Sequence, residues 1–186
     1  MSDSLGDRMK TQYENRTRYY LPRRTYTICR IDGKSFHTYT KGLQKPYDPL
    51  FNSVMDETAK YVLSIIDGGQ FVYTQSDEIS ILMTDFAELD TQAWFDGNLQ
   101  KICSVAASAA AAMFNSTMCE EFRVQKLGCF DARVFTIPDR NEVANYFLWR
   151  TRDCMRNSIN ALGQFYYSNA QLHGKNTGQV GHAGKW

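Results

Sequence analysis

Two acidic positions have the residue types that metal-assisted chemistry needs. Asp32 stands in the segment Arg30-Ile-Asp-Gly-Lys-Ser-Phe-His37, and Asp77 stands in the segment Tyr73-Thr-Gln-Ser-Asp-Glu78. Two carboxylates held close together raise each other's pKa unless a cation lies between them, and Mg²⁺ prefers oxygen ligands and phosphates. Such a pair can hold two metal ions about 3.5–4 Å apart, which activate an attacking oxygen and steady a triphosphate. The two segments therefore suggest nucleotidyl transfer.

The residues beside these aspartates fit the same chemistry. Gly33 lets the backbone approach a ligand closely, its carbonyl is a candidate metal ligand, and the amides that follow can wrap phosphates. The alternative is that Asp32-Gly33 and Ser76-Asp77 are ordinary turn residues. Spacing alone leaves both interpretations open, because short motifs also match by chance.

Sites built on cysteine or histidine are not expected. The five cysteines contain no CxxC pair and are odd in number, which argues against a disulfide framework and a cysteine zinc site. The three histidines form no HExxH motif. Any metal should therefore be a hard cation bound by carboxylates.

Hydrophobic patterning predicts the elements that would position these residues. Residues 25–31 are β-branched and aromatic and predict a strand that runs into a turn at Asp32-Gly33. A helix is predicted from Asp48-Pro49 to Gly68-Gly69, because its apolar residues recur at helical spacing. The runs QFVYT and EISILM, which flank residues 75–77, predict a β-hairpin.

The second half of the chain completes a recognisable order. A helical stretch is predicted over residues 91–118, where the alanines of residues 105–113 would let it lie close to a sheet. CFDARVFTIP predicts a fourth strand, and residues 142–162 predict a third helix with Trp149 in the core. The order β-α-β-β-α-β followed by a helix predicts an α+β fold of the ferredoxin-like, split βαβ type. Its first and third strands are antiparallel neighbours, so Asp32 and Asp77 should meet at one end, with Glu78 beside them.

Composition sets the class of protein. With 186 residues, 43% hydrophobic and 22% charged, the chain should form one globular domain, which excludes disorder, collagen and a coiled coil. The polar N-terminus does not resemble a signal peptide, and Ser, Asn and Ala interrupt the uncharged run 102–119, so we expect a soluble, cytoplasmic protein without a membrane partner. We expect a single domain over residues 1–170 and a flexible or truncated tail over residues 171–186, whose glycines show no periodicity.

Charge is unevenly distributed along the chain. Residues 1–45 hold ten Lys and Arg against four Asp and Glu, although the whole chain has a net charge of only +1. These cations alternate with tyrosines, a mixture suited to phosphates and to base stacking. A solvated charged arm is an equally good interpretation of the composition.

Five motifs in this order resemble the tRNAHis guanylyltransferase family over about residues 5–170. They are Arg30-Ile-Asp-Gly-Lys-Ser-Phe-His37, Lys45-Pro-Tyr-Asp48, Tyr73-Thr-Gln-Ser-Asp-Glu78, Phe130-Asp-Ala-Arg133 and Tyr146-Phe-Leu-Trp-Arg-Thr-Arg-Asp-Cys154. Five ordered matches are far more specific than any single one. The resemblance implies a polymerase-like palm that adds GTP or other nucleotides to the 5′ end of tRNA, in the 3′-to-5′ direction.

The resemblance also implies roles for individual residues. Asp32 and Asp77, with the Gly33 carbonyl, would hold two Mg²⁺ ions, and Lys45 would act when ATP adenylates the tRNA 5′ phosphate. The nucleotide would contact the residues already named around the aspartates and one distant lysine: Asp32, Gly33, Lys34, Ser35, Phe36, His37, Ser76, Asp77 and Lys101. Arg150, Arg152 and Asn157 are weaker candidates for RNA contact. The family forms dimers and tetramers, so self-association is also expected.

One departure concerns the substrate. Asp153-Cys154 is followed by Met155-Arg156-Asn157-Ser158, whereas family members that recognise histidine tRNA continue with His-Ile-Asn-Asn. This form resembles the guanylyltransferase-like proteins, for which the implied activity is template-directed repair of 5′-truncated tRNAs. Two other functions stay open: a palm-type nucleotide cyclase, and a non-catalytic RNA-binding module, although no RNP1 signature is present.

Overall fold

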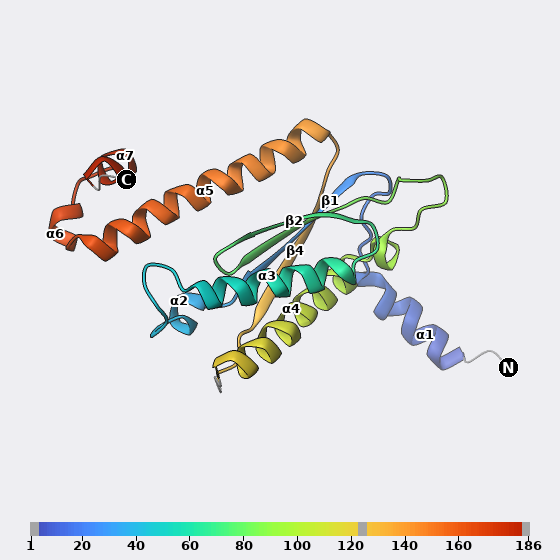
Figure 1. Cartoon of the computed structure of the whole chain (residues 1–186). Helices are drawn as coiled ribbons and strands as arrows, with labels where there is room; N and C mark the ends of the chain where they lie inside the picture. Colours follow the sequence, from blue (N-terminus) through green and yellow to red (C-terminus); the bar gives the residue numbers. More distant parts are fainter. Residues whose placement is uncertain (1–3, 123–125, 184–186) are drawn as a thin grey trace.

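The computed structural model describes residues 4–122 and 126–183, and it contains one four-stranded sheet with helices on both faces (Figure 1). The elements in chain order are α1 (Ser4–Gln12), η1 (Glu14–Thr17), β1 (Tyr26–Gly33), α2 (Phe36–Tyr39), α3 (Pro49–Ser64), β2 (Gly69–Gln75), β3 (Glu78–Met83), η2 (Trp94–Gly97), α4 (Leu99–Phe122), β4 (Phe130–Ile137), α5 (Arg140–Tyr166), α6 (Asn169–Leu172) and α7 (Thr177–Ala183).

The sheet has the strand order β2-β3-β1-β4, and every neighbouring pair is antiparallel. The α+β class is thus confirmed, with β1 and β3 at the centre as expected. In the register of these two strands, Asp32 lies opposite Glu78 and Ile28 lies opposite Leu82. The end of β1 and the start of β3 therefore meet at the same end of the sheet.

Helices α3 and α4 cover one face of the sheet, and α5 lies on the other (Figure 1). The core between the sheet and helices α3 and α4 contains alternate residues of the central strands, such as Ile31 and Ile79. Ala106 and Ala110 are fully buried in α4, which agrees with the expectation that alanine lets this helix lie close to the sheet. Asp48 caps α3, because its side chain accepts hydrogen bonds from the main-chain N–H groups of Leu50 and Phe51.

Helix α4 begins later than the sequence predicts. Residues 91–98 are not α-helical: η2 contains Phe95 and Asp96 at φ values of 50° and 54°, which no α-helix accommodates. Judged by length and composition alone, the helical segment Leu99–Glu120 could cross a membrane. In this fold, Ile102, Phe114 and their neighbours on the same face of the helix belong to the core.

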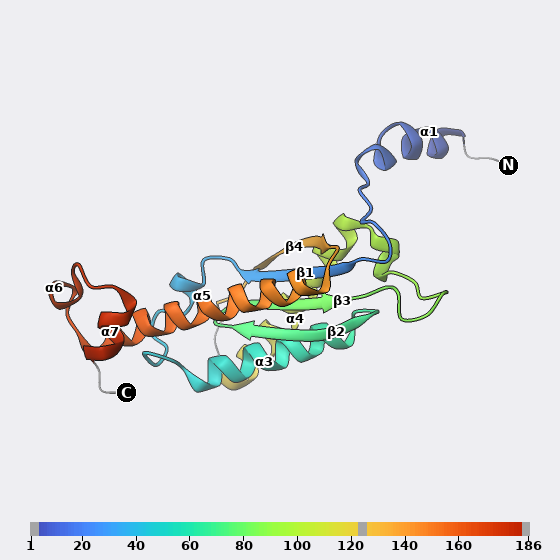
Figure 2. The same ribbon diagram turned by 90° about the horizontal axis from the view of Figure 1, so that it is seen from above.

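Helix α5 differs most from the prediction. It begins at Arg140, capped by Asp139, and continues to Tyr166, beyond the predicted end at residue 162. Trp149 is 53% exposed rather than part of the core. The helix extends past the end of the sheet and there carries α6 and α7 (Figures 1 and 2).

The C-terminal segment, expected to be a flexible or truncated tail, contains the helices α6 and α7. The capping box of Ser168 and Gln171 starts α6, and Val180 of α7 is buried. A Cβ atom on Gly163 would lie 2.7 Å from the Val180 side chain, so glycine is what lets α7 approach α5. Residues 184–186 of the predicted tail lie outside the described residues.

Candidate active site

The two predicted metal-binding aspartates lie at the same end of the sheet. Asp32 is near the end of β1, and Asp77 is in the two-residue turn between β2 and β3. The Gly33 main-chain N–H donates to the Asp77 carbonyl oxygen at 3.1 Å, which ties β1 to this turn. Ser76, the other turn residue, has a φ of 50°. The antiparallel pairing of β1 with β3 therefore joins two positions that are 45 residues apart in the sequence.

The carboxylate of Asp77 is poorly stabilised as an anion. Burial raises the pKa of Asp77, and the nearby charges of Asp32 and Glu78 raise it further, although hydrogen bonds from its own N–H and from Ser76 oppose the change. Among the described residues, Asp32 forms an ion pair only with Arg133, whose Nη2 atom lies 4.0 Å from its Oδ2 atom. A divalent cation would relieve this repulsion.

The donor set at this end fits Mg²⁺ rather than a transition metal. Asp32, Asp77 and the Gly33 carbonyl offer oxygen ligands only, and phosphate and water supply the remaining ligands of Mg²⁺ in many nucleotide enzymes. Within residues 4–122 and 126–183, no three His, Cys, Asp or Glu side chains are grouped so as to hold an ion by themselves. A cation held by Asp32 and Asp77 would complete its coordination with water or phosphate.

The loop after Asp32 is fixed by packing beneath it. A Cβ atom on Gly33 would lie 2.4 Å from the Phe36 ring, so Phe36 can pack against this strand end only because residue 33 is glycine. Phe36 is 3% exposed and packs against Phe51, Phe114 and Phe130, so its side chain supports the loop from below. The side chains of Lys34, Ser35 and His37 are exposed above it.

A cavity of about 480 Å³ adjoins the Asp77 turn. It lies between the loop that precedes α3, the β2–β3 hairpin and α5. Its lining includes Lys45, Asp48, Asn52, Ser76, Cys154 and Asn157. Three predicted site residues, Lys45, Ser76 and Asn157, thus line one cavity from three separate parts of the chain, although Asp77 itself is not part of the lining.

One predicted site residue lies elsewhere. Lys101 is on the first turn of α4, where its N–H donates to the side chain of Asn98 at 3.0 Å. The opposite part of α4, at Phe114, packs against the loop after Asp32, so Lys101 lies about 20 Å along the helix from it. Within one copy of the chain, Lys101 therefore does not share a site with the aspartates.

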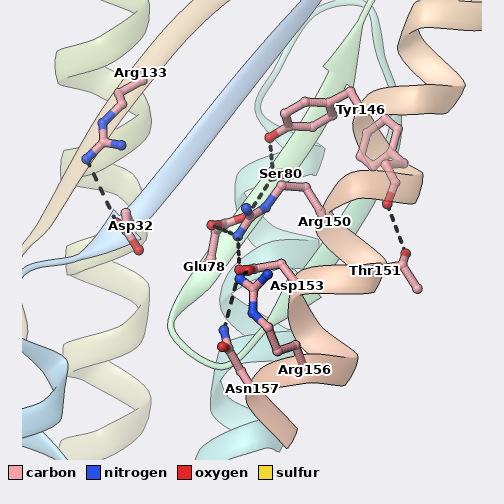
Figure 3. Close-up of polar contacts among 11 residues, drawn as sticks. Asp32, Glu78, Ser80, Arg133, Tyr146, Arg150, Thr151, Asp153, Arg156 and Asn157 are labelled. Atoms are coloured by element: carbon pink, nitrogen blue, oxygen red, sulfur yellow. Dashed lines mark hydrogen bonds and ion pairs between the residues drawn. The ribbon is translucent and has the colours of Figure 1, made fainter. Parts of the chain in front are cut away.

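Arg150, which was expected to contact RNA, is buried instead. It is 6% exposed, and its guanidinium donates to both carboxylate oxygens of Glu78 at 2.7 and 2.8 Å (Figure 3). Arg152 is exposed on the same helix. No local sequence pattern indicates this pair, because its members are 72 positions apart; only the resemblance places both in site motifs.

Comparisons with known proteins place the chain in a family. Residues 6–138 match the tRNAHis guanylyltransferase family. A bacterial tRNA(His) guanylyltransferase-like protein in complex with ATP is 49% identical, with a TM-score of 0.92 over 96% of this chain and 78% of that one. A bacterial tRNA(His) guanylyltransferase-like protein in complex with GTP is 51% identical, with a TM-score of 0.84 over 89% of this chain and 78% of that one.

A curated relative extends the comparison to eukaryotes. The tRNA(His) guanylyltransferase of Debaryomyces hansenii is 32% identical over 155 residues, which make up 80% of this chain. This chain spans only 56% of the length of that yeast protein. The sheet, the paired aspartates and the family match over most of the chain agree, and the chain belongs to the tRNAHis guanylyltransferase family of nucleotidyltransferases.

Proposed function

We propose that this protein adds GTP or other nucleotides to the 5′ end of tRNA in the 3′-to-5′ direction. The observation that carries the proposal is the convergence of Asp32, Gly33 and Asp77 beside a cavity lined by Lys45 and Ser76, in a chain of this family. The ATP and GTP complexes of similar bacterial proteins support these two nucleotides as ligands. The ferredoxin-like sheet would serve as the palm.

The protein's own residues would bind and orient the reactants. Two Mg²⁺ ions held by Asp32, Asp77 and the Gly33 carbonyl would neutralise phosphate charge and lower the pKa of the attacking hydroxyl. The exposed side chains of Lys34, Ser35 and His37, with Ser76, would contact the nucleotide. No protein nucleophile is needed, because positioning and charge stabilisation supply most of the rate in phosphoryl transfer.

The reaction would proceed in two balanced steps. First, the 5′-phosphate oxygen of the tRNA attacks the α-phosphorus of ATP, which releases pyrophosphate and leaves the 5′ end adenylated. Then the 3′-hydroxyl of the incoming nucleotide attacks the activated 5′ phosphorus and AMP leaves, while the hydroxyl proton passes to solvent. Lys45, exposed at the cavity wall, would stabilise the charge that develops during the first step. A tRNA that already carries a 5′-triphosphate needs only the second step, with pyrophosphate as the leaving group.

The substrate we favour is a 5′-truncated tRNA rather than histidine tRNA alone. The supporting observation is the sequence Asp153-Cys154-Met155-Arg156-Asn157-Ser158, in which Cys154, Asn157 and Ser158 line the cavity. Activity in the cytoplasm and assembly into a dimer or tetramer are part of the same proposal.

The role of Lys45 provides the test. We expect Lys45→Ala to reduce nucleotide addition to 5′-monophosphorylated tRNA by about a hundredfold or more, while addition to 5′-triphosphorylated tRNA stays near the wild-type rate. Lys41→Ala, which removes an exposed lysine of the same loop, is the matched control. Addition is followed with labelled GTP on denaturing gels.

Other outcomes of this assay would favour other functions. Equal loss on both substrates would contradict the assignment of Lys45 to activation. Conversion of GTP to a cyclic nucleotide without tRNA would favour the cyclase, and tRNA binding without any turnover would favour the binding module.

A further inference from the structure

A buried arginine of α5 contacts both residues that close the Asp77 turn. Gln75 and Glu78 are register partners on either side of Ser76 and Asp77. Arg150 Nε donates to Glu78 Oε1 at 2.8 Å, and Arg150 Nη2 donates to Glu78 Oε2 at 2.7 Å (Figure 3). With the Gln75 amide oriented to satisfy its partners, its oxygen accepts from Arg150 Nη2 at 2.6 Å and its nitrogen donates to the Arg150 carbonyl at 2.7 Å.

We propose that Arg150 is a positioning residue, which fixes the turn carrying Asp77 against α5. This inference rests on the proposed function for its effect on the reaction. Glu78 is then the anchor of the turn rather than a metal ligand, because the guanidinium occupies both of its carboxylate oxygens. Of the three neighbouring carboxylates, Asp32 and Asp77 would therefore bind the cation, and Glu78 binds the arginine.

The surroundings of Arg150 hold its guanidinium in one orientation. Asp153 Oδ2 accepts from Nη2 at 3.2 Å, and Asp153 is itself paired with Arg156. On the strand side, Ser80 Oγ donates to Glu78 Oε1 at 3.3 Å and is hydrogen-bonded to the Tyr146 hydroxyl at 2.8 Å. A two-pronged, charge-assisted contact of this kind specifies geometry as well as contributing energy, and lysine cannot reproduce it.

The same stretch of α5 also forms the wall of the cavity. Cys154 and Asn157, one to two turns beyond Arg150, line it together with Ser76. The Tyr47 hydroxyl donates to the Ser158 carbonyl at 2.9 Å, so the loop that carries Lys45 is attached to this stretch too. A shift of α5 relative to the hairpin would therefore move Asp77 and the Lys45 loop out of register with each other.

The test compares two conservative variants with a matched control. Arg150→Lys keeps the charge but loses the two-pronged contact, and Glu78→Gln keeps the size but loses the charge. Arg140→Lys makes the same substitution at an exposed position at the start of α5. For Arg150→Lys we expect kcat for nucleotide addition to fall about 10- to 100-fold with an unchanged KM for tRNA. Hydrogen–deuterium exchange should rise selectively in residues 74–79, and Arg140→Lys should match the wild type in both measurements.

Coupling between the partners gives a second criterion. If Arg150 acts through Glu78, the double variant should lose about as much kcat as the more impaired single variant, rather than the product of both losses. Wild-type kcat in Arg150→Lys, or independent losses in the double variant, would overturn the inference. It would also be overturned if exchange rose evenly throughout the molecule with a lower melting temperature and unchanged kcat of the folded fraction.

The failure of the proposed function would give a different result. In that case the wild type would add no nucleotide to any tRNA. The hydrogen–deuterium exchange measurement would still show whether Arg150 holds the turn that carries Asp77. Unchanged exchange of residues 74–79 in Arg150→Lys would then show that Arg150 does not hold the turn.

Discussion

Three carboxylates at one end of the sheet differ in what neutralises them. Glu78 is buried with the guanidinium of Arg150, and Asp32 has Arg133 at 4.0 Å. In the part of the chain that the structure describes, Asp77 has no Lys or Arg within ion-pair distance, and burial raises its pKa. The site is therefore arranged so that its most buried unpaired carboxylate is the one that gains most from a cation.

This arrangement predicts an unusual effect of Asp77→Asn on stability. A carboxyl group whose pKa is raised by folding binds its proton more tightly in the folded state, so ionised Asp77 destabilises the metal-free fold at neutral pH. In EDTA at pH 7, we expect Asp77→Asn to melt at the same temperature as the wild type or higher. The difference in melting temperature between the variant and the wild type should become smaller as the pH falls toward the ordinary pKa of Asp, about 4. Differential scanning fluorimetry measures this.

The matched control is Asp90→Asn, which removes one negative charge from an exposed loop. It should leave the melting temperature within the error of the wild type at both pH values. A clearly lower melting temperature for Asp77→Asn in EDTA would contradict the assignment of electrostatic strain to this position.

At the scale of elements, the features that depend on residues close together in the sequence could be predicted. The cap at Asp48 and the strands on either side of Ser76-Asp77 follow from local signals, and the structure has both. Residues 91–98 were assigned to a helix because their apolar spacing allows one, but the positive φ of Phe95 breaks it. Helix α7 was not predicted because the glycines of its segment show no periodicity, and its packing against α5 is apparent only in the tertiary structure.

The packing of α7 against α5 leads to a second prediction. Val180 is 7% exposed against Gly163, so Val180→Ala removes buried contacts and should lower stability by about 1–2 kcal/mol. Hydrogen–deuterium exchange should rise in the last turns of α5 and leave the central strands unchanged. Leu89→Ala, at a residue that is 94% exposed, is the control and should change neither the stability nor the exchange at the end of α5. Unaltered exchange at the end of α5 would contradict the docking of α7.

At the scale of the whole molecule, charge and shape are both asymmetric. The basic N-terminal segment starts with α1, which buries none of its residues and projects from the body at the end away from α6 and α7 (Figures 1 and 2). Tyr13, Tyr19 and Tyr20 are exposed close behind it. Part of the positive charge is used within the fold, since Arg23 pairs with Asp85. Arg8 and Lys10 of α1 are exposed and could contact phosphates.

If this segment contacts tRNA, its contribution should depend on salt. Replacing Arg8 and Lys10 by Gln should weaken tRNA binding and reduce the slope of log K against log salt by about 1.5, because each phosphate contact contributes about 0.7–0.9. The melting temperature should stay unchanged, since α1 has no buried residue. Lys60→Gln with Lys175→Gln removes two exposed lysines elsewhere and serves as control. An unchanged slope for the α1 variant would show that α1 is exposed to solvent and does not contact tRNA.

The most direct test of the account is single-nucleotide addition by the wild type and by Asp77→Asn, compared with Asp90→Asn. The substrate is 5′-monophosphorylated tRNA that lacks its first nucleotide, with labelled GTP, ATP and Mg²⁺. We expect extension by the wild type and by Asp90→Asn, and a loss of about a thousandfold or more in folded Asp77→Asn, as the removal of a metal ligand implies. Extension by Asp77→Asn at the wild-type rate would contradict the account, because the aspartates would then not form the catalytic site.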